Sequence, residues 1–168
     1  MPLLASGLAD ELRSALNFPA PTSDQLVGWA GGIVDEITQS GSATSRNIPG
    51  PHPISGLSGS SMANRVASAA GYDSVSPELL DFCNAISTHI QSFGQVFYTL
   101  PVPAPPGIQP PMAFFLNGTI TGLNGPLLAS AVAAQVGYPS VTPQLLAKCT
   151  ALTNHIMLNA LVTDGVIA

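Results

Sequence analysis

The sequence predicts a mainly α fold with short β elements, in which internally duplicated helical hairpins are joined by Pro-rich loops. The main observation is that residues 56–90 align without a gap to residues 122–156, with 17 identities in 35 positions. A chain that repeats itself at a fixed offset is typical of a repeated structural unit. Between the two segments the helical spacing of apolar residues gives way to aromatic, β-prone runs, and the chain contains 16 Gly and 16 Pro.

The first hairpin, over about residues 2–38, is expected to be a degenerate third copy at the N-terminus. Ile33 and Ile37 take the places of two isoleucines of the second copy, and Glu36 stands where the other copies have histidine. This copy aligns with the others only when insertions and deletions are allowed.

The second and third hairpins are expected over about residues 58–92 and 124–160. In each, the first helix should end at a glycine, and the second should begin with a hydroxyl residue followed by proline. The second helix of each copy carries apolar residues at positions i, i+4, i+7 and i+11, which predicts one buried face. The residues of these faces, with both cysteines expected to stay reduced, are Leu79, Cys83, Ile86 and Ile90, and Leu145, Cys149, Leu152 and Ile156.

Short β elements are expected near residues 95–100 and 112–121, where aromatic and β-branched residues gather. The Pro-rich stretch between them should form an extended loop. We expect this loop to lie against a neighbouring subunit, because alone it cannot bury its aromatic ends while its prolines hold it extended. The candidate protein-interface residues are Phe97, Tyr98, Pro105, Pro106, Phe114 and Phe115.

The expected organisation is one compact unit with three parts. Residues 1–54 comprise the degenerate hairpin and a Gly/Ser/Pro-rich linker. Residues 55–120 comprise the second repeat with the aromatic β segment and the Pro-rich loop, and residues 121–168 comprise the third repeat.

The low charge and the short apolar stretches exclude two classes of partner. Only 8% of residues are charged, and four Lys and Arg stand against nine Asp and Glu, so no basic patch for nucleic acid can form. A membrane-spanning helix needs about 20 consecutive apolar residues. The best apolar stretch, residues 126–138, is shorter and contains polar side chains. We therefore expect neither nucleic acid nor membrane as a partner.

The sequence offers no catalytic constellation, so we expect no enzyme activity. Cys83 and Cys149 lie on apolar helix faces, where thiols are inert. His89 and His155 follow them by six residues, which places Cys and His on different faces of one helix and makes a metal site unfavourable. We expect no metal and no cofactor, and we expect each histidine to cap or hydrogen-bond at the end of its hairpin, with any further role left open.

The motif Pro-Gln/Glu-Leu-Leu-x-x-Cys-x-Ala-x-x-x-His-Ile, followed by Asn159-Ala160-Leu161-Val162, resembles small virion structural proteins of tailed bacteriophages. Those proteins often combine such a helical unit with a Gly/Thr strand like residues 117–122. The resemblance covers about the last two thirds of the chain and implies no catalytic residues.

Together with the low charge, the internal duplication and the Pro-rich loop, this resemblance predicts a non-enzymatic virion structural or assembly protein. It would be a capsid, neck or tail component that forms a homo-oligomer and contacts other virion structural proteins. It would be synthesised in the host cytoplasm and located in the virion. The alternative is a small helical module of a bacterial cell that binds a ligand or peptide in the groove between hairpins. An enzyme with a thiol or metal centre is a third, less favoured hypothesis.

Overall fold

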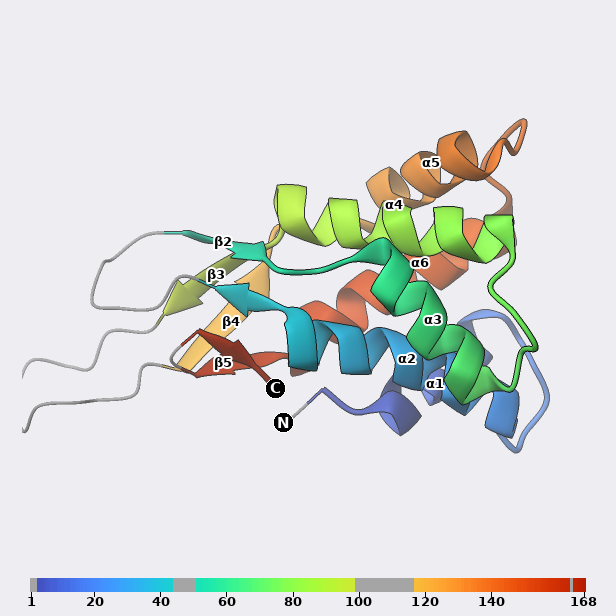
Figure 1. The fold of residues 1–168 in the computed structure, drawn as a ribbon, viewed down its shortest axis with the longest axis horizontal. Coiled ribbons are helices and arrows are strands. Elements are labelled where there is room, and N and C mark those ends of the chain that lie inside the picture. The colour runs from blue at the N-terminus through green and yellow to red at the C-terminus, as the bar shows by residue number, and fades with distance from the viewer. Residues whose placement is uncertain (1–2, 44–50, 99–116, 164) are drawn as a thin grey trace, which may run out of the picture.

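The computed structural model describes residues 3–43, 51–98, 117–163 and 165–168. Helices form one end of the molecule and a small barrel of strands forms the other (Figure 1). The helices are α1 (Ala5–Ala15), α2 (Asp24–Ser40), α3 (Gly59–Ala70), α4 (Pro77–Phe93), α5 (Gly125–Val136) and α6 (Pro143–Asn159). The strands are β1 (Ser42–Ala43), β2 (His52–Ser55), β3 (Gln95–Tyr98), β4 (Asn117–Thr121), β5 (Leu161–Thr163) and β6 (Val166–Ile167).

The six strands pair in chain order into one closed antiparallel barrel, and β6 closes it by pairing with both β5 and β1. Side chains alternate along the strands, so that Val96, Ile120, Val162 and Ile167 fill the interior. A Cβ added to Gly118 would lie 2.6 Å from Val96 Cγ1. Because side chains already occupy this narrow interior, position 118 must be glycine.

The predicted fold class is wrong. The structure is a mixed α/β fold, because segments between the helices supply the strands of the barrel, including β1 and β2 in a stretch that was expected to be a loop. The helices are also not separate hairpins: α2 packs against α3, α4 against α5 and α6 against α1, as well as within each pair. The packing unit is therefore a ring of six helices rather than a set of hairpins joined by Pro-rich loops.

Local signals define where the helices begin and end. Ser76 Oγ and Thr142 Oγ1 accept hydrogen bonds from backbone N–H groups in the first turns of α4 and α6, and proline occupies the first helical position of both. Helices α3 and α5 end at Gly71 and Gly137, whose φ values of 73° and 83° lie in the left-handed region. These residues were expected to start and stop the helices, and they do.

One apolar core extends from the helices into the barrel. Of the eight residues predicted to form the two buried helix faces, seven are buried. Leu79 is the exception, since its side chain is only partly covered. The single tryptophan, Trp29, is also buried, and its ring meets that of Phe82 edge to face at 5.6 Å.

Helices α2 and α3 approach each other closely because two positions of α2 are glycine. A Cβ on Gly28 would overlap the backbone of α3 at Ala69, and a Cβ on Gly32 would overlap it at Val66. Any side chain at these positions would push the two helices apart. In the part of the chain that the structure describes, no helix is both long and apolar enough to cross a bilayer.

Candidate functional site

The residues predicted to form a protein interface are only partly described. Phe97 points outward from β3 and is 46% exposed, because the side chains of this strand alternate between the barrel interior and its surface. Tyr98 is half-buried, and its ring lies 5.3 Å from that of His52 on β2. The other four candidates, Pro105, Pro106, Phe114 and Phe115, lie outside the described residues.

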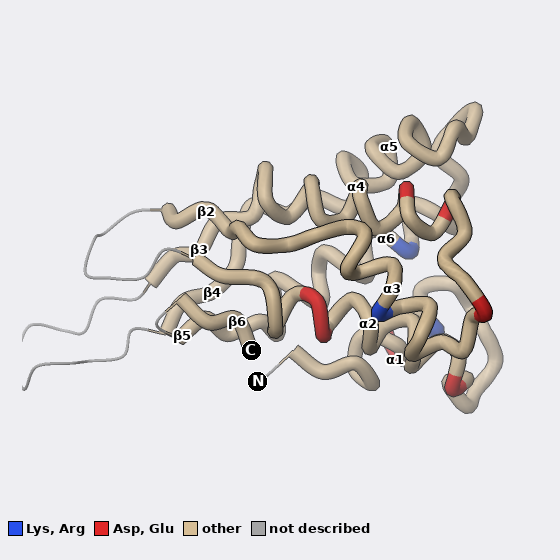
Figure 2. Tube along the Cα trace, in the orientation of Figure 1, with Lys and Arg blue, Asp and Glu red and all other residues tan. Residues whose placement is uncertain are grey.

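In the residues that the structure describes, the barrel end of the molecule combines apolar side chains with an absence of charged ones. The six strands contain no Lys, Arg, Asp or Glu, and Figure 2 shows such residues only on the helices and the segments that join them. Beside Phe97, exposed apolar side chains lie on β6 (Val166) and at the C-terminal ends of α4 (Phe93) and α6 (Leu158). Among the described residues, this end therefore presents apolar side chains in uncharged surroundings.

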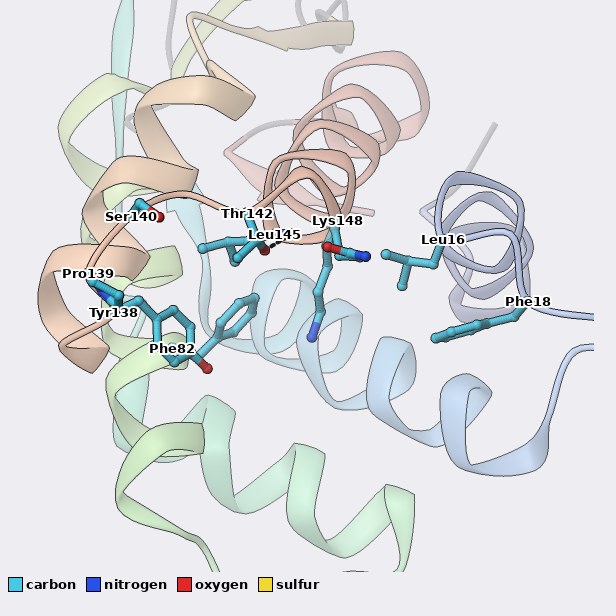
Figure 3. A pocket seen from close by; sticks show the side chains of 10 residues that line it. Leu16, Phe18, Phe82, Tyr138, Pro139, Ser140, Thr142, Leu145 and Lys148 are labelled. Atoms are coloured by element: carbon cyan, nitrogen blue, oxygen red, sulfur yellow. Dashed lines mark hydrogen bonds between the residues drawn. The ribbon is translucent and has the colours of Figure 1, made fainter.

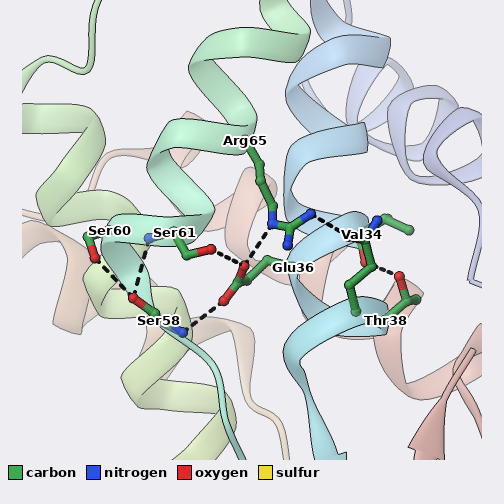
Figure 4. Close-up of polar contacts among 8 residues, drawn as sticks. Val34, Glu36, Thr38, Ser58, Ser60, Ser61 and Arg65 are labelled. Atoms are coloured by element: carbon green, nitrogen blue, oxygen red, sulfur yellow. Dashed lines mark hydrogen bonds and ion pairs between the residues drawn. The ribbon is translucent and has the colours of Figure 1, made fainter.

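A buried carboxylate joins α2 to the start of α3. Glu36 has no exposed surface, and its carboxylate accepts hydrogen bonds from Ser58 N–H (2.9 Å), Ser61 Oγ (2.6 Å) and Arg65 Nε (3.0 Å), as Figure 4 shows. Burial alone would raise the pKa of Glu36. The hydrogen bonds from Ser61, Ser58 and Ser40, together with the Arg65 charge, outweigh burial and hold this pKa below its usual value. The carboxylate is thus charged and structural.

The two histidines hold similar places at the ends of α4 and α6. His89 Nε2 accepts a hydrogen bond from the Asn124 N–H (3.2 Å) at the start of α5, and burial lowers the pKa of His89. His155 Nδ1 lies 2.9 Å from Glu11 Oε1 on α1. The hydrogen-bonding role expected for these histidines is confirmed, but each bond joins one helix pair to another rather than ending a single hairpin.

Both cysteines are free thiols in the core. Burial raises the pKa of Cys83 and that of Cys149 to about 12, so neither is a nucleophile at neutral pH. Among the described residues, no group of three or more His, Cys, Asp or Glu side chains is placed to hold a metal ion.

The structure also contains a pocket that the sequence did not predict, with a volume of about 460 Å³. It lies where the end of α1, the second turn of α4, the turn between α5 and α6 and the start of α6 meet. Apolar and aromatic side chains line most of it, and Figure 3 shows Lys148 extending from α6 into the space between Phe82 and Phe18. The apolar lining residues are Leu16, Phe18, Phe82, Tyr138 and Leu145.

The amine of Lys148 is held by aromatic rings. Its Nζ lies 3.9 Å from the centroid of the Trp29 ring and 4.4 Å from that of Phe82. Burial lowers the pKa of Lys148 to about 8. The one sequence signal that singles out this lysine is its position as the first charged residue after a 66-residue uncharged stretch that begins at residue 82.

Comparison with known proteins found no match to the chain among family models, curated proteins or solved structures.

Proposed function

We propose that this protein is a non-enzymatic structural component of a virion, in the capsid, neck or tail of a tailed phage. It acts by associating with further copies of itself and with other virion structural proteins. The virion location rests on the resemblance of the sequence motif to those of small phage structural proteins. The contact surface rests on the barrel end, whose strands are uncharged and expose apolar side chains, and this is the observation that carries the proposal.

Charge distribution favours protein as the partner over nucleic acid. Of the Lys and Arg residues in the described ranges, Arg13 lies 3.9 Å from Asp10, Arg65 binds Glu36, and Lys148 lies beneath two aromatic rings. None of the three offers a free surface cation to a phosphate backbone. An apolar surface without charge is instead typical of the central part of a protein interface.

The closed barrel restricts how such contacts form. Each strand in the described chain is paired on both sides, so β-strand addition at an open edge is not available. Association must then use side chains that point outward from the barrel. Phe97 is the largest of these on the strands and is the expected anchor, since buried aromatic side chains carry a large share of interface energy.

The test compares Phe97→Ser with Tyr72→Ser. Tyr72 is 40% exposed, against 46% for Phe97, but it lies in the α3–α4 turn, at the end of the molecule opposite the barrel (Figure 1). We expect Phe97→Ser to weaken self-association by about tenfold or more, the effect of losing one aromatic anchor, and Tyr72→Ser to leave it unchanged. Analytical ultracentrifugation and incorporation of each variant into particles measure this, with circular dichroism as the check on folding.

A second variant tests the segment between β3 and β4. Deleting residues 102–109, which belong to the part outside the described residues, should leave the helices folded and reduce both self-association and incorporation into particles. If neither Phe97→Ser nor this deletion changes them, the barrel end is not the assembly surface.

A further inference from the structure

Lys148 is a cation without a counter-ion in the described part of the chain. The other two described cations, Arg13 and Arg65, each have a carboxylate within 4.0 Å, at Asp10 and Glu36. No carboxylate lies within ion-pair distance of Lys148 Nζ among the described residues. A partly buried charge is costly unless it is paired, so this amine is a site at which an anion would be stabilised.

The aromatic rings of Trp29 and Phe82 hold the amine in place without neutralising it. A cation over a ring face is attracted by the quadrupole of the ring, but it keeps its charge and its hydrogen-bond donors. Lys148 also lines the 460 Å³ pocket, so a molecule bound there would contact this side chain. With a pKa of about 8, the amine is mostly protonated at neutral pH.

The N-terminal end of α6 adds a second feature that favours an anion. This 17-residue helix begins at Pro143, and Thr142 and Gln144 line the same pocket. Thr142 accepts the N–H groups of Leu145 and Leu146, whereas the Gln144 N–H has no partner in the described ranges. The partial positive charge of the helix end therefore lies at the same pocket as Lys148.

The rest of the pocket is apolar. Phe18 and Tyr138 are about half exposed, at 51% and 48%, and Phe82 and Leu145 form a buried wall. A volume of about 460 Å³ lies within the usual range for small-molecule sites. A single ammonium group in such surroundings matches one negative charge on an apolar body, and it does not supply the several donors that a phosphate dianion requires.

We infer that the pocket binds a small monocarboxylate with an apolar body, whose carboxylate pairs with Lys148 Nζ and whose body packs against Phe18, Phe82 and Tyr138. This inference is independent of the assembly proposal, because the pocket lies among the helices and not at the barrel end (Figures 1 and 3).

The experiment titrates the full chain with decanoate as the probe. Trp29 is the only tryptophan and lies next to the Lys148 amine, so its fluorescence should report binding, and calorimetry should give the stoichiometry. We expect saturable one-to-one binding of decanoate and at least tenfold weaker binding of decanol, which has a similar body without the charge.

Two variants separate the charge from the fold. Lys148→Met keeps a long side chain in the aromatic cage and should weaken decanoate binding by about tenfold or more, the effect of losing a charge-assisted hydrogen bond. Arg13→Gln removes a cation that does not line this pocket and should leave binding unchanged. The inference is overturned if decanoate does not bind, if decanol binds equally well, or if folded Lys148→Met protein binds decanoate as the wild type does.

Discussion

At residue scale, Glu36 shows how this weakly charged chain uses a buried charge. Its carboxylate has no exposed surface, yet it accepts hydrogen bonds from Ser58, the residue before α3, and from Ser61 and Arg65 within α3. A buried charge is tolerated only when such partners compensate its lost hydration. Glu36 therefore connects α2 to α3 by polar contacts where most other helix contacts are apolar.

Glu36→Gln should lower the free energy of unfolding by about 1.5–3 kcal/mol at pH 7, because an amide cannot replace the charged hydrogen bonds. The folded-state pKa of Glu36 lies below its ordinary value of 4.5. The stabilisation from the carboxylate is thus fully present above pH 4.5 and is lost as the pH falls through the lower, folded-state pKa. Urea unfolding at pH 7, 5 and about 3 should show the difference between wild type and variant shrinking at the lowest pH.

The matched control for this prediction is Asp35→Asn, which removes an exposed carboxylate from the neighbouring position of α2. It should change stability by less than about 0.5 kcal/mol, as surface substitutions usually do. A difference between wild type and Glu36→Gln that stays constant down to about pH 3 would contradict the charged, hydrogen-bonded state of Glu36.

At the scale of elements, the contact between α2 and α3 depends on the absence of side chains. Gly28 and Gly32 face the backbone of α3, while Gly31 on the same helix would place a Cβ only 3.8 Å from that of Ala5, an ordinary contact. Glycine costs a helix up to about 1 kcal/mol relative to alanine. Its presence at positions 28 and 32 is therefore explained by packing, not by helix formation.

Gly32→Ala should destabilise the protein by about 1–3 kcal/mol, since the added methyl group overlaps the α3 backbone and forces the helices apart. Gly31→Ala should be neutral or stabilise by up to about 1 kcal/mol. Urea unfolding of both variants measures this. Equal effects of the two substitutions would show that α2 and α3 do not pack as closely as described.

Whether an element could be predicted from the sequence depends on whether local or long-range contacts define it. Helix ends depend on neighbouring residues, such as Thr142 with Pro143 at the start of α6, so local patterns identify them. Strands of two residues, such as β1 and β6, exist only through pairing with partners distant in sequence, and no local period reveals them. The barrel was therefore missed, and with it the fold class.

The candidate sites also differ in whether they depend on neighbouring residues or on residues that are distant in the sequence. Phe97 was named as an interface candidate because aromatic residues flank the Pro-rich loop, a pattern that is local in the sequence, and its interface role stays a prediction. The Lys148 pocket was missed because its walls come from Leu16, Phe82 and Tyr138, which lie far apart in the chain and meet only in the folded protein.

At the scale of the whole molecule, the described charged residues lie in the helical part and not on the strands. The helices and the segments between them hold the described Lys, Arg, Asp and Glu residues (Figure 2), while the six strands have none and expose Phe97 and Val166. A closed barrel keeps its backbone hydrogen bonds internal, so its outer side chains are free to contact another molecule without disturbing the fold. The account as a whole therefore requires that the isolated protein self-associates.

The mass of the purified protein in solution, measured by sedimentation equilibrium over a wide range of concentration, tests this requirement most directly. One chain has a mass of 17.1 kDa. We expect the average mass to rise with concentration toward a defined multiple of this value. A mass that stays at 17.1 kDa up to the highest concentration would contradict assembly through self-association.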